Sequence, residues 1–176
     1  VARLQPARFA AVDDITVRGI AAVTNLPSHI PHRMARRAYN LLLEAGLTPT
    51  IEAIRERGAG PGAGIVLWRS QAGFSYLGRK GLPAEDVALG AVAELNAFMD
   101  NGAAVDRYLA DQLLIPAALA HGQSSFTTDN ISRHLLTGIQ LLRQWLGVSI
   151  TVQGAPGEFG SVVVDGAGYR SGQLIN

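Results

Sequence analysis

The chain has 176 residues, 48% of them hydrophobic, and a net charge of only +1. That is enough apolar material for one good core or two small ones, and the charge gives no sign of a strong, chain-wide attraction to polyanions. Because cysteine is absent, disulfides and thiolate metal sites are excluded. No apolar run approaches the roughly 20 residues of a membrane span, and no signal peptide is visible. We therefore expect a soluble, cytoplasmic protein.

The first part of the chain predicts a small α/β unit. Residues 3–12 allow one short strand. After it, alternation and helical periodicity predict strands over 15–26, 48–57, 65–70 and 73–77, with a helix over 32–45 that Gly46 ends. The glycine-rich stretch Gly58 to Gly64 lacks the Gly-Lys-Ser/Thr ending of a phosphate-binding loop and leads into a strand, so we interpret it as a hairpin turn.

A different pattern begins at Gly81. Helices are expected over 83–100 and 105–121, and Pro116 should kink or restart the second of them. A short polar strand (124–128) precedes Asp129, Asn130 and Ser132, all good helix caps. A helix should follow to Gly147, and then strands over 148–154 and 157–164.

His134 falls in the first turn of that last helix. The free N–H groups and the positive dipole of a helix start attract phosphate and favour an uncharged imidazole. An unprotonated imidazole can attack phosphorus. The alternative is a histidine that only caps or packs at a helix end.

The helix over 105–121 carries a second candidate group. Tyr108, Asp111 and Gln112 are spaced i, i+3 and i+4, so they share one face. A purine could stack on Tyr108 and form a hydrogen bond with the Asp111 carboxylate or the Gln112 amide, although such residues at a helix start are more often structural.

His29 and His32 have the spacing of metal ligands but no third ligand nearby. The arginines on that helix suit either RNA phosphates or a solvated face (Arg33, Arg36, Arg37).

Several blocks together resemble the RNA 3′-terminal phosphate cyclase family. They are A-x-x-D-R-Y-L-A-D-Q-L-L-I-P-A-A-L-A (Ala103 to Ala120), S-S-F-T-T (Ser124 to Thr128), R-H-L-L-T-G-I (Arg133 to Ile139), L-G-R-K-G-L-P-A-E (Leu77 to Glu85) and G-P-G-A-G-I-V-L-W (Gly60 to Trp68). The resemblance runs from about Ile15 to Val152. It implies an α/β fold of α+β layers, in which a small α/β domain is inserted into a large domain of two-helix-on-four-strand repeats. Residues 1–14 would end one repeat, 15–80 would form the insert, and 81–176 would form the C-terminal repeat.

The resemblance also implies an activity and its site residues. His134 matches the family's nucleophile, which would carry AMP through a phosphoramidate bond. The nucleotide-binding segment matches Tyr108, Leu109, Ala110, Asp111 and Gln112, with the aromatic ring on adenine. Family enzymes use ATP and a divalent metal (Mg or Mn) to convert an RNA 3′-phosphate into a 2′,3′-cyclic phosphate. The metal ligands cannot be carried over to this sequence.

The resemblance covers only the C-terminal half of such enzymes. The N-terminal half supplies the metal-binding acid and several phosphate-binding arginines, so we expect this chain alone to lack adenylation activity and to need a complementary half. Core faces around Leu113, Leu114 and Leu119 would lack partners, which predicts an oligomer or a hetero-assembly. The alternative is a non-catalytic RNA- or ribosome-associated relative or remnant of the same fold, which would have no need of His134. The related enolpyruvyl transferase fold gives no reason for the H-L-L-T block.

Overall fold

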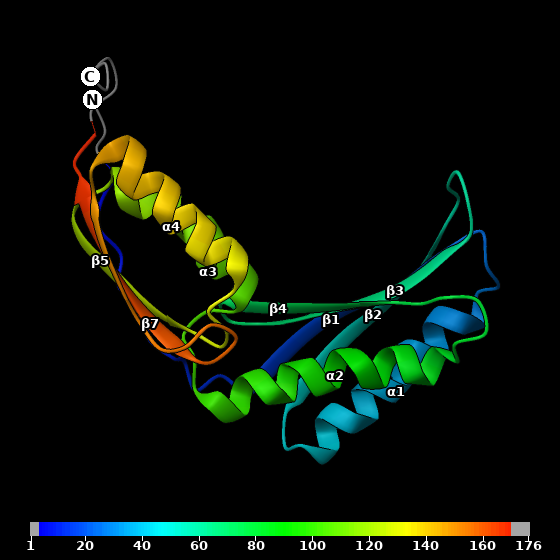
Figure 1. The fold of residues 1–176 in the computed structure, drawn as a ribbon. Coiled ribbons are helices and arrows are strands. Elements are labelled where there is room, and N and C mark those ends of the chain that lie inside the picture. Colours follow the sequence, from blue (N-terminus) through cyan, green and yellow to red (C-terminus); the bar gives the residue numbers. More distant parts are fainter. Residues whose placement is uncertain (1–3, 170–176) are drawn as a thin grey trace. The chain divides into compact units, whose positions relative to one another are not determined.

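The structure, a computed structural model, describes residues 4–169, and these residues form two compact units (Figure 1). Residues Asp13–Asp100 make up the first, which we call the 13–100 unit. The second, here the C-terminal unit, combines the residues up to Val12 with those from Asn101 onward. Both units layer helices on a sheet, which confirms the predicted α+β architecture. Within residues 4–169, no helix combines the length and the apolar character needed to cross a membrane.

The 13–100 unit contains a mixed four-stranded sheet of order β2-β1-β3-β4. Its strand β1 is parallel to β2 and antiparallel to β3, and β3 forms a hairpin with β4. The elements are β1 (Thr16–Thr24), α1 (His29–Glu44), β2 (Thr48–Glu56), β3 (Gly62–Arg69), β4 (Ala72–Leu77) and α2 (Ala84–Asn101). They follow the predicted strand, helix, strand and hairpin order, with ends that differ by a few residues.

The core of this unit lies between one face of the sheet and the two helices. Alternate residues of β1 are buried (Val17, Ala21, Val23), as the period of a strand requires. Helix α1 buries Met34, Ala38 and Leu42, which are spaced four apart and so form one stripe. The apolar periodicity of the sequence therefore identifies the inward faces of both kinds of element.

The glycine-rich stretch is not a hairpin turn, contrary to our prediction. Strands β2 and β3 are not neighbours, because β1 lies between them in the sheet. The connection therefore crosses the end of β1 and is held there by its side chains: Asn25 Nδ2 donates to the Gly58 carbonyl (2.7 Å) and Thr24 Oγ1 to the Gly60 carbonyl (3.0 Å). The hairpin is formed by β3 and β4, and Ser70 at its turn has a positive φ of 48°.

The boundary between the units also differs from the one we expected near residue 80. Helix α2 belongs to the 13–100 unit, so that unit ends at Asp100. Its buried face includes Val87, Leu95 and Phe98, and the Phe98 ring packs against the Phe74 ring of β4 with centroids 5.6 Å apart. Because this buried face of α2 packs against the sheet, residues 81–100 belong to the same unit as the preceding strands.

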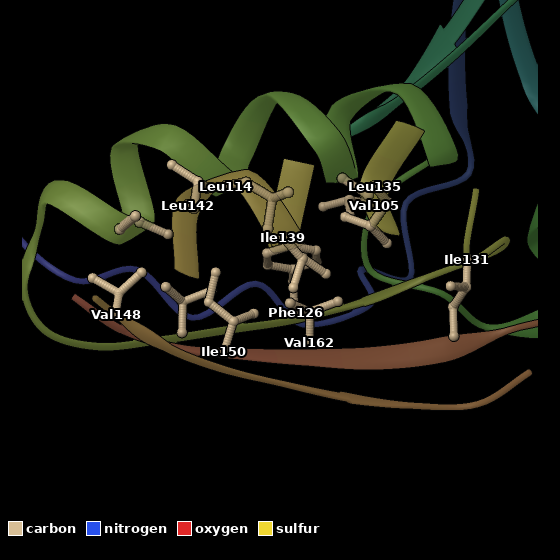
Figure 2. Packing of buried hydrophobic residues seen from close by; sticks show 14 of the residues in the cluster. Val105, Leu114, Phe126, Ile131, Leu135, Ile139, Leu142, Val148, Ile150 and Val162 are labelled. Carbon is tan, nitrogen blue, oxygen red and sulfur yellow. The ribbon is translucent and has the colours of Figure 1, made fainter. Parts of the chain in front are cut away.

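The C-terminal unit has a three-stranded antiparallel sheet of order β5-β7-β6 with two helices on one face. Its elements are α3 (Arg107–Leu119), β5 (His121–Thr128), α4 (Arg133–Leu146), β6 (Ser149–Gln153) and β7 (Gly160–Ala167). Figure 2 shows the core, where side chains of both helices meet those of the strands.

A short bridged segment extends this sheet, from residues that we expected to end a different repeat. Residues 4–9 run beside β5: Ser125 N–H donates to the Ala7 carbonyl and Phe9 N–H to the Ser125 carbonyl, both at 3.0 Å. The pairing is parallel at Arg8 and Ser125. Pro6 has no N–H to contribute, which limits the ladder that this segment can form.

Helix α3 continues through Pro116 to Leu119 without a restart, although the proline has no N–H to donate to the carbonyl four residues earlier. Leu114, predicted to lack a partner, is only 1% exposed in the unit's own core. Exposed apolar side chains on α3 and α4 include Ile115, Leu141 and Trp145.

An ion pair joins the helices of the 13–100 unit. Arg33 on α1 donates to both carboxylate oxygens of Glu85 on α2, with distances of 2.8 and 2.7 Å. These hydrogen bonds from Arg33 lower the pKa of the Glu85 carboxyl below its ordinary value. Because the folded-state pKa is depressed, the pair stabilises the fold above the unfolded-state pKa and loses that contribution as pH falls through the folded-state pKa.

We therefore expect Glu85→Gln to destabilise the 13–100 unit slightly at pH 7, by about 0.5 kcal/mol, since both partners are substantially exposed. The difference from the wild type should disappear as pH falls below the lowered folded-state pKa of Glu85, where the wild-type carboxyl is protonated as well. Urea unfolding at a series of pH values measures this. A difference that persisted unchanged at pH 3 would contradict the assignment to charge.

Candidate active site at the first turns of α3 and α4

The start of α4 presents His134 to solvent. Ser132 is the N-cap, and its Oγ accepts a hydrogen bond from the Leu135 N–H at 3.1 Å. His134 is the second residue of the helix and is exposed, whereas Leu135 behind it is fully buried. The prediction that His134 lies in a first turn is confirmed. Ser132 alone of the predicted caps performs this role, because the Asp129 and Asn130 side chains have other partners described below.

The start of α3 is fixed by a buried cap. Asp106 is 5% exposed, and its Oδ1 accepts hydrogen bonds from the Tyr108 and Leu109 N–H groups, both at 2.8 Å. The carboxylate satisfies N–H groups that have no partner inside the helix and places a negative charge at the positive end of the dipole. Tyr108 thereby stands on a rigid first turn.

These helix starts lie at the same end of the C-terminal unit. Arg107, the first residue of α3, donates from Nε (2.9 Å) and Nη2 (2.6 Å) to Oδ2 of Asp129 in the segment before α4. Further along, a Cβ added to Gly138 of α4 would be only 3.0 Å from Leu114 Cδ1 of α3. The helices therefore run in parallel and side by side, as Figure 1 also shows.

The contact between Gly138 and Leu114 indicates which side chains meet at the first turns. His134 is one turn before Gly138, on the same edge of α4. Asp111 is one turn before Leu114 on α3. Because the two helices run in parallel, we infer that His134 lies beside the first turns of α3, on the side that carries Asp111.

The segment that leads into α4 is held by the turn between β6 and β7. Asn130 Nδ2 donates to the Gly157 carbonyl at 3.1 Å, and Ile131 N–H donates to the Glu158 carbonyl at 2.8 Å. The Ile131 side chain is 1% exposed and fills the space left by Gly160, where an added Cβ would be 2.3 Å from Ile131 Cδ1. These contacts set the position from which α4, and with it His134, begins.

The structure divides the predicted nucleotide-binding segment into outward and inward residues. Tyr108 (55% exposed) and Gln112 are exposed and Asp111 is half-buried, so these three share the outer face as their spacing predicts. Ala110 is fully buried and Leu109 packs against the core. Leu109 and Ala110 can therefore offer a ligand little besides backbone atoms. Recognition by side chains would depend on the three outward residues.

The Arg107–Asp129 ion pair could not be predicted from local sequence patterns, because its partners are 22 positions apart. The cap at Asp106 was detectable from an acid directly before a helical stripe. Arg133, exposed beside His134, is a further cation at the start of α4. Among residues 4–169, the buried Asp129 Oδ1 has no hydrogen-bond partner.

Residues 4–169 contain no group of three His, Asp or Glu side chains placed to hold a metal ion. His29 and His32 thus have no third ligand of these types in the described structure. Asp111 on α3 is a half-buried acid between the exposed Tyr108 and Gln112 in the chain.

Comparisons with known proteins agree with this architecture. Residues 15–100 match the family model described as the RNA 3′-terminal phosphate cyclase (RTC) insert domain, whose end coincides with that of the 13–100 unit. An RNA 3′-terminal phosphate cyclase of Nostoc punctiforme is 52% identical over 133 residues, which cover 73% of this chain and 38% of the relative. One from Methanosarcina mazei is 42% identical over 80% of this chain and 40% of its own length.

A third relative of the same name, from Pyrobaculum neutrophilum, is 34% identical over 96% of this chain and 52% of the relative. The chain belongs to the RNA 3′-terminal phosphate cyclase family. It spans about half or less of the length of these curated relatives.

Removing Arg107 should destabilise the C-terminal unit. Arg107→Ala leaves the Asp129 carboxylate, 2% exposed, buried without its charge partner. We expect a loss of about 2–3 kcal/mol in the free energy of unfolding, somewhat less than for a fully buried pair because Arg107 is partly exposed. The double variant Arg107→Ala/Asp129→Ala should recover part of the loss. Urea denaturation measures both, with the exposed Arg36→Ala as the control; equal stability of Arg107→Ala and Arg36→Ala would contradict the argument.

Proposed function

We propose that this chain supplies the nucleophile and the adenine-binding helix for ATP-dependent conversion of an RNA 3′-terminal phosphate into a 2′,3′-cyclic phosphate. The observation that carries the proposal is that exposed Tyr108 and exposed His134 stand on adjacent, capped first turns. The relatives' name provides the reaction and its RNA substrate.

Tyr108, Asp111 and Gln112 suit an adenine nucleotide. The exposed Tyr108 ring offers a face on which adenine would stack, and such contacts are worth about 1–3 kcal/mol per base. Gln112 can donate to and accept from the edge of the base, and Asp111 can accept from the ribose hydroxyls. Bound in this way, the nucleotide would extend its phosphates toward the start of α4, where the N–H groups and Arg133 favour anions.

His134 is the proposed nucleophile. A lone pair of the imidazole attacks the α-phosphorus of ATP, an N–P bond forms, and the bond to the bridging oxygen breaks with release of pyrophosphate. An oxygen of the RNA 3′-phosphate then attacks the same phosphorus, and the N–P bond breaks to free the imidazole. Finally the 2′-hydroxyl oxygen attacks the terminal phosphorus of the RNA, AMP leaves, and the hydroxyl proton is lost.

Arg133 is the charged side chain placed to assist the first step. A divalent metal, when bound, would neutralise charge on the departing pyrophosphate, and the acid that holds it is expected from the half of the enzyme outside this chain. Arg133 would orient phosphate oxygens beside His134. Pyrophosphate release needs several such positive groups, so we propose that further ones come from outside this chain.

The test is a chimera in which this chain replaces the matching segment of the Nostoc punctiforme relative, an exchange favoured by their 52% identity. Incubated with α-labelled ATP and magnesium, the chimera should form acid-labile protein–AMP and cyclise a 3′-phosphorylated RNA. His134→Ala should abolish the label, because the proposed attacking imidazole is then absent. His121→Ala, which removes another exposed histidine of the same unit, is the matched control and should retain the label.

Two results would contradict the proposal. Label that survives His134→Ala would refute the nucleophile assignment. A folded chimera that binds RNA but forms neither protein–AMP nor cyclic phosphate would favour the non-catalytic alternative. The isolated chain should show little labelling under the same conditions, since losing even one stabilising donor typically lowers a rate about a hundredfold.

A further inference from the structure

The 13–100 unit contains a cavity that the proposed chemistry does not use. It measures about 480 Å³, within the range of small-ligand sites. The aliphatic side chains of Leu26, Ile30 and Met34 line it from the side of α1, and those of Leu82 and Val87 from the side of α2. A group the size of a nucleobase fits this volume.

Two cations stand at the rim of this cavity. Arg79 and Lys80 line it and are exposed, and within residues 4–169 neither has an ion-pair partner. They lie on a tight turn in which Leu82 N–H donates to the Arg79 carbonyl at 3.0 Å. Gly81 in this turn has a φ of +85°, a conformation that favours glycine. The turn therefore presents both cations at a defined place.

The nearby acids do not cancel this charge. The carboxylate of Glu85, in the first turn of α2, already accepts hydrogen bonds from Nε and Nη2 of Arg33. Asp86 is exposed but does not line the cavity. An apolar cavity with unpaired cations at its rim complements a ligand that joins an uncharged planar group to phosphates. A nucleotide within a nucleic acid strand has this composition.

We propose that the 13–100 unit binds single-stranded RNA, with one base in this cavity and the adjacent phosphates on Arg79 and Lys80. The choice of RNA over other polyanions rests on the proposed function. A base can enter the cavity only when it is unpaired, so a duplex should not bind in this way. The unit would hold a strand of the RNA substrate apart from the reacting end.

The test measures fluorescence anisotropy of a labelled 12-nucleotide RNA with the full chain and without ATP, so it does not depend on catalysis. Arg79→Ala/Lys80→Ala should weaken binding about tenfold at 50 mM salt and make the salt dependence shallower by about 1.4 in log–log slope. The matched control is Arg18→Ala/Arg57→Ala. It also removes two exposed cations, from outside the cavity lining, and should change affinity less than twofold.

The cavity is tested separately from the charges. Ala63→Phe fills it without changing charge, so affinity should fall while the salt slope stays the same. An abasic oligonucleotide of equal length should compete poorly even with the unaltered chain, which checks base insertion without a mutation. Unchanged affinity in Arg79→Ala/Lys80→Ala would overturn the proposal. So would equal binding of duplex RNA, or equally good competition by an acidic peptide.

Discussion

The site depends on the ion pair between Arg107 and Asp129. It connects the first residue of α3 to the segment that precedes α4, and it acts together with the hydrogen bonds from the Val105 and Ala104 N–H groups to Thr127 in β5. A nearly buried carboxylate needs its cation, so the geometry has little freedom. The outward positions of Tyr108 and His134 follow from this arrangement, and the nucleotide proposal follows from those positions.

The surrounding packing supports the same geometry. Gly138 allows α4 to approach Leu114 of α3 closely, and Gly166 of β7 allows the sheet to approach the end of α3, where an added Cβ would be 2.3 Å from the Ala120 carbonyl oxygen. Small residues at both contacts let the helices lie near each other and near the sheet. A site built on such packed helices keeps its side chains in a fixed arrangement, which the proposed attack of His134 on phosphorus would require.

Much of the fold could be predicted from the sequence, because strong apolar stripes mark the helices and Gly147 ends α4 in the left-handed conformation. Glycines within strands misled the prediction: Gly62 and Gly64 belong to β3, although their composition is typical of a turn. The stripe of α2 showed a buried face but not which sheet would cover it. The spacing of Tyr108, Asp111 and Gln112 predicted their common face. The Arg107–Asp129 contact spans separate elements, so no local pattern could predict it.

The central claim is that the first turns of α3 and α4 form one nucleotide site. Backbone amide chemical shifts of the labelled chain, titrated with a non-hydrolysable ATP analogue and magnesium, test this most directly, since NMR detects even weak binding. The account predicts that the shifted amides are those around Tyr108 to Gln112 and Ser132 to Leu136, together, with one dissociation constant. Shifts confined to the 13–100 unit, or shifts in the first turn of one helix without the other, would contradict it.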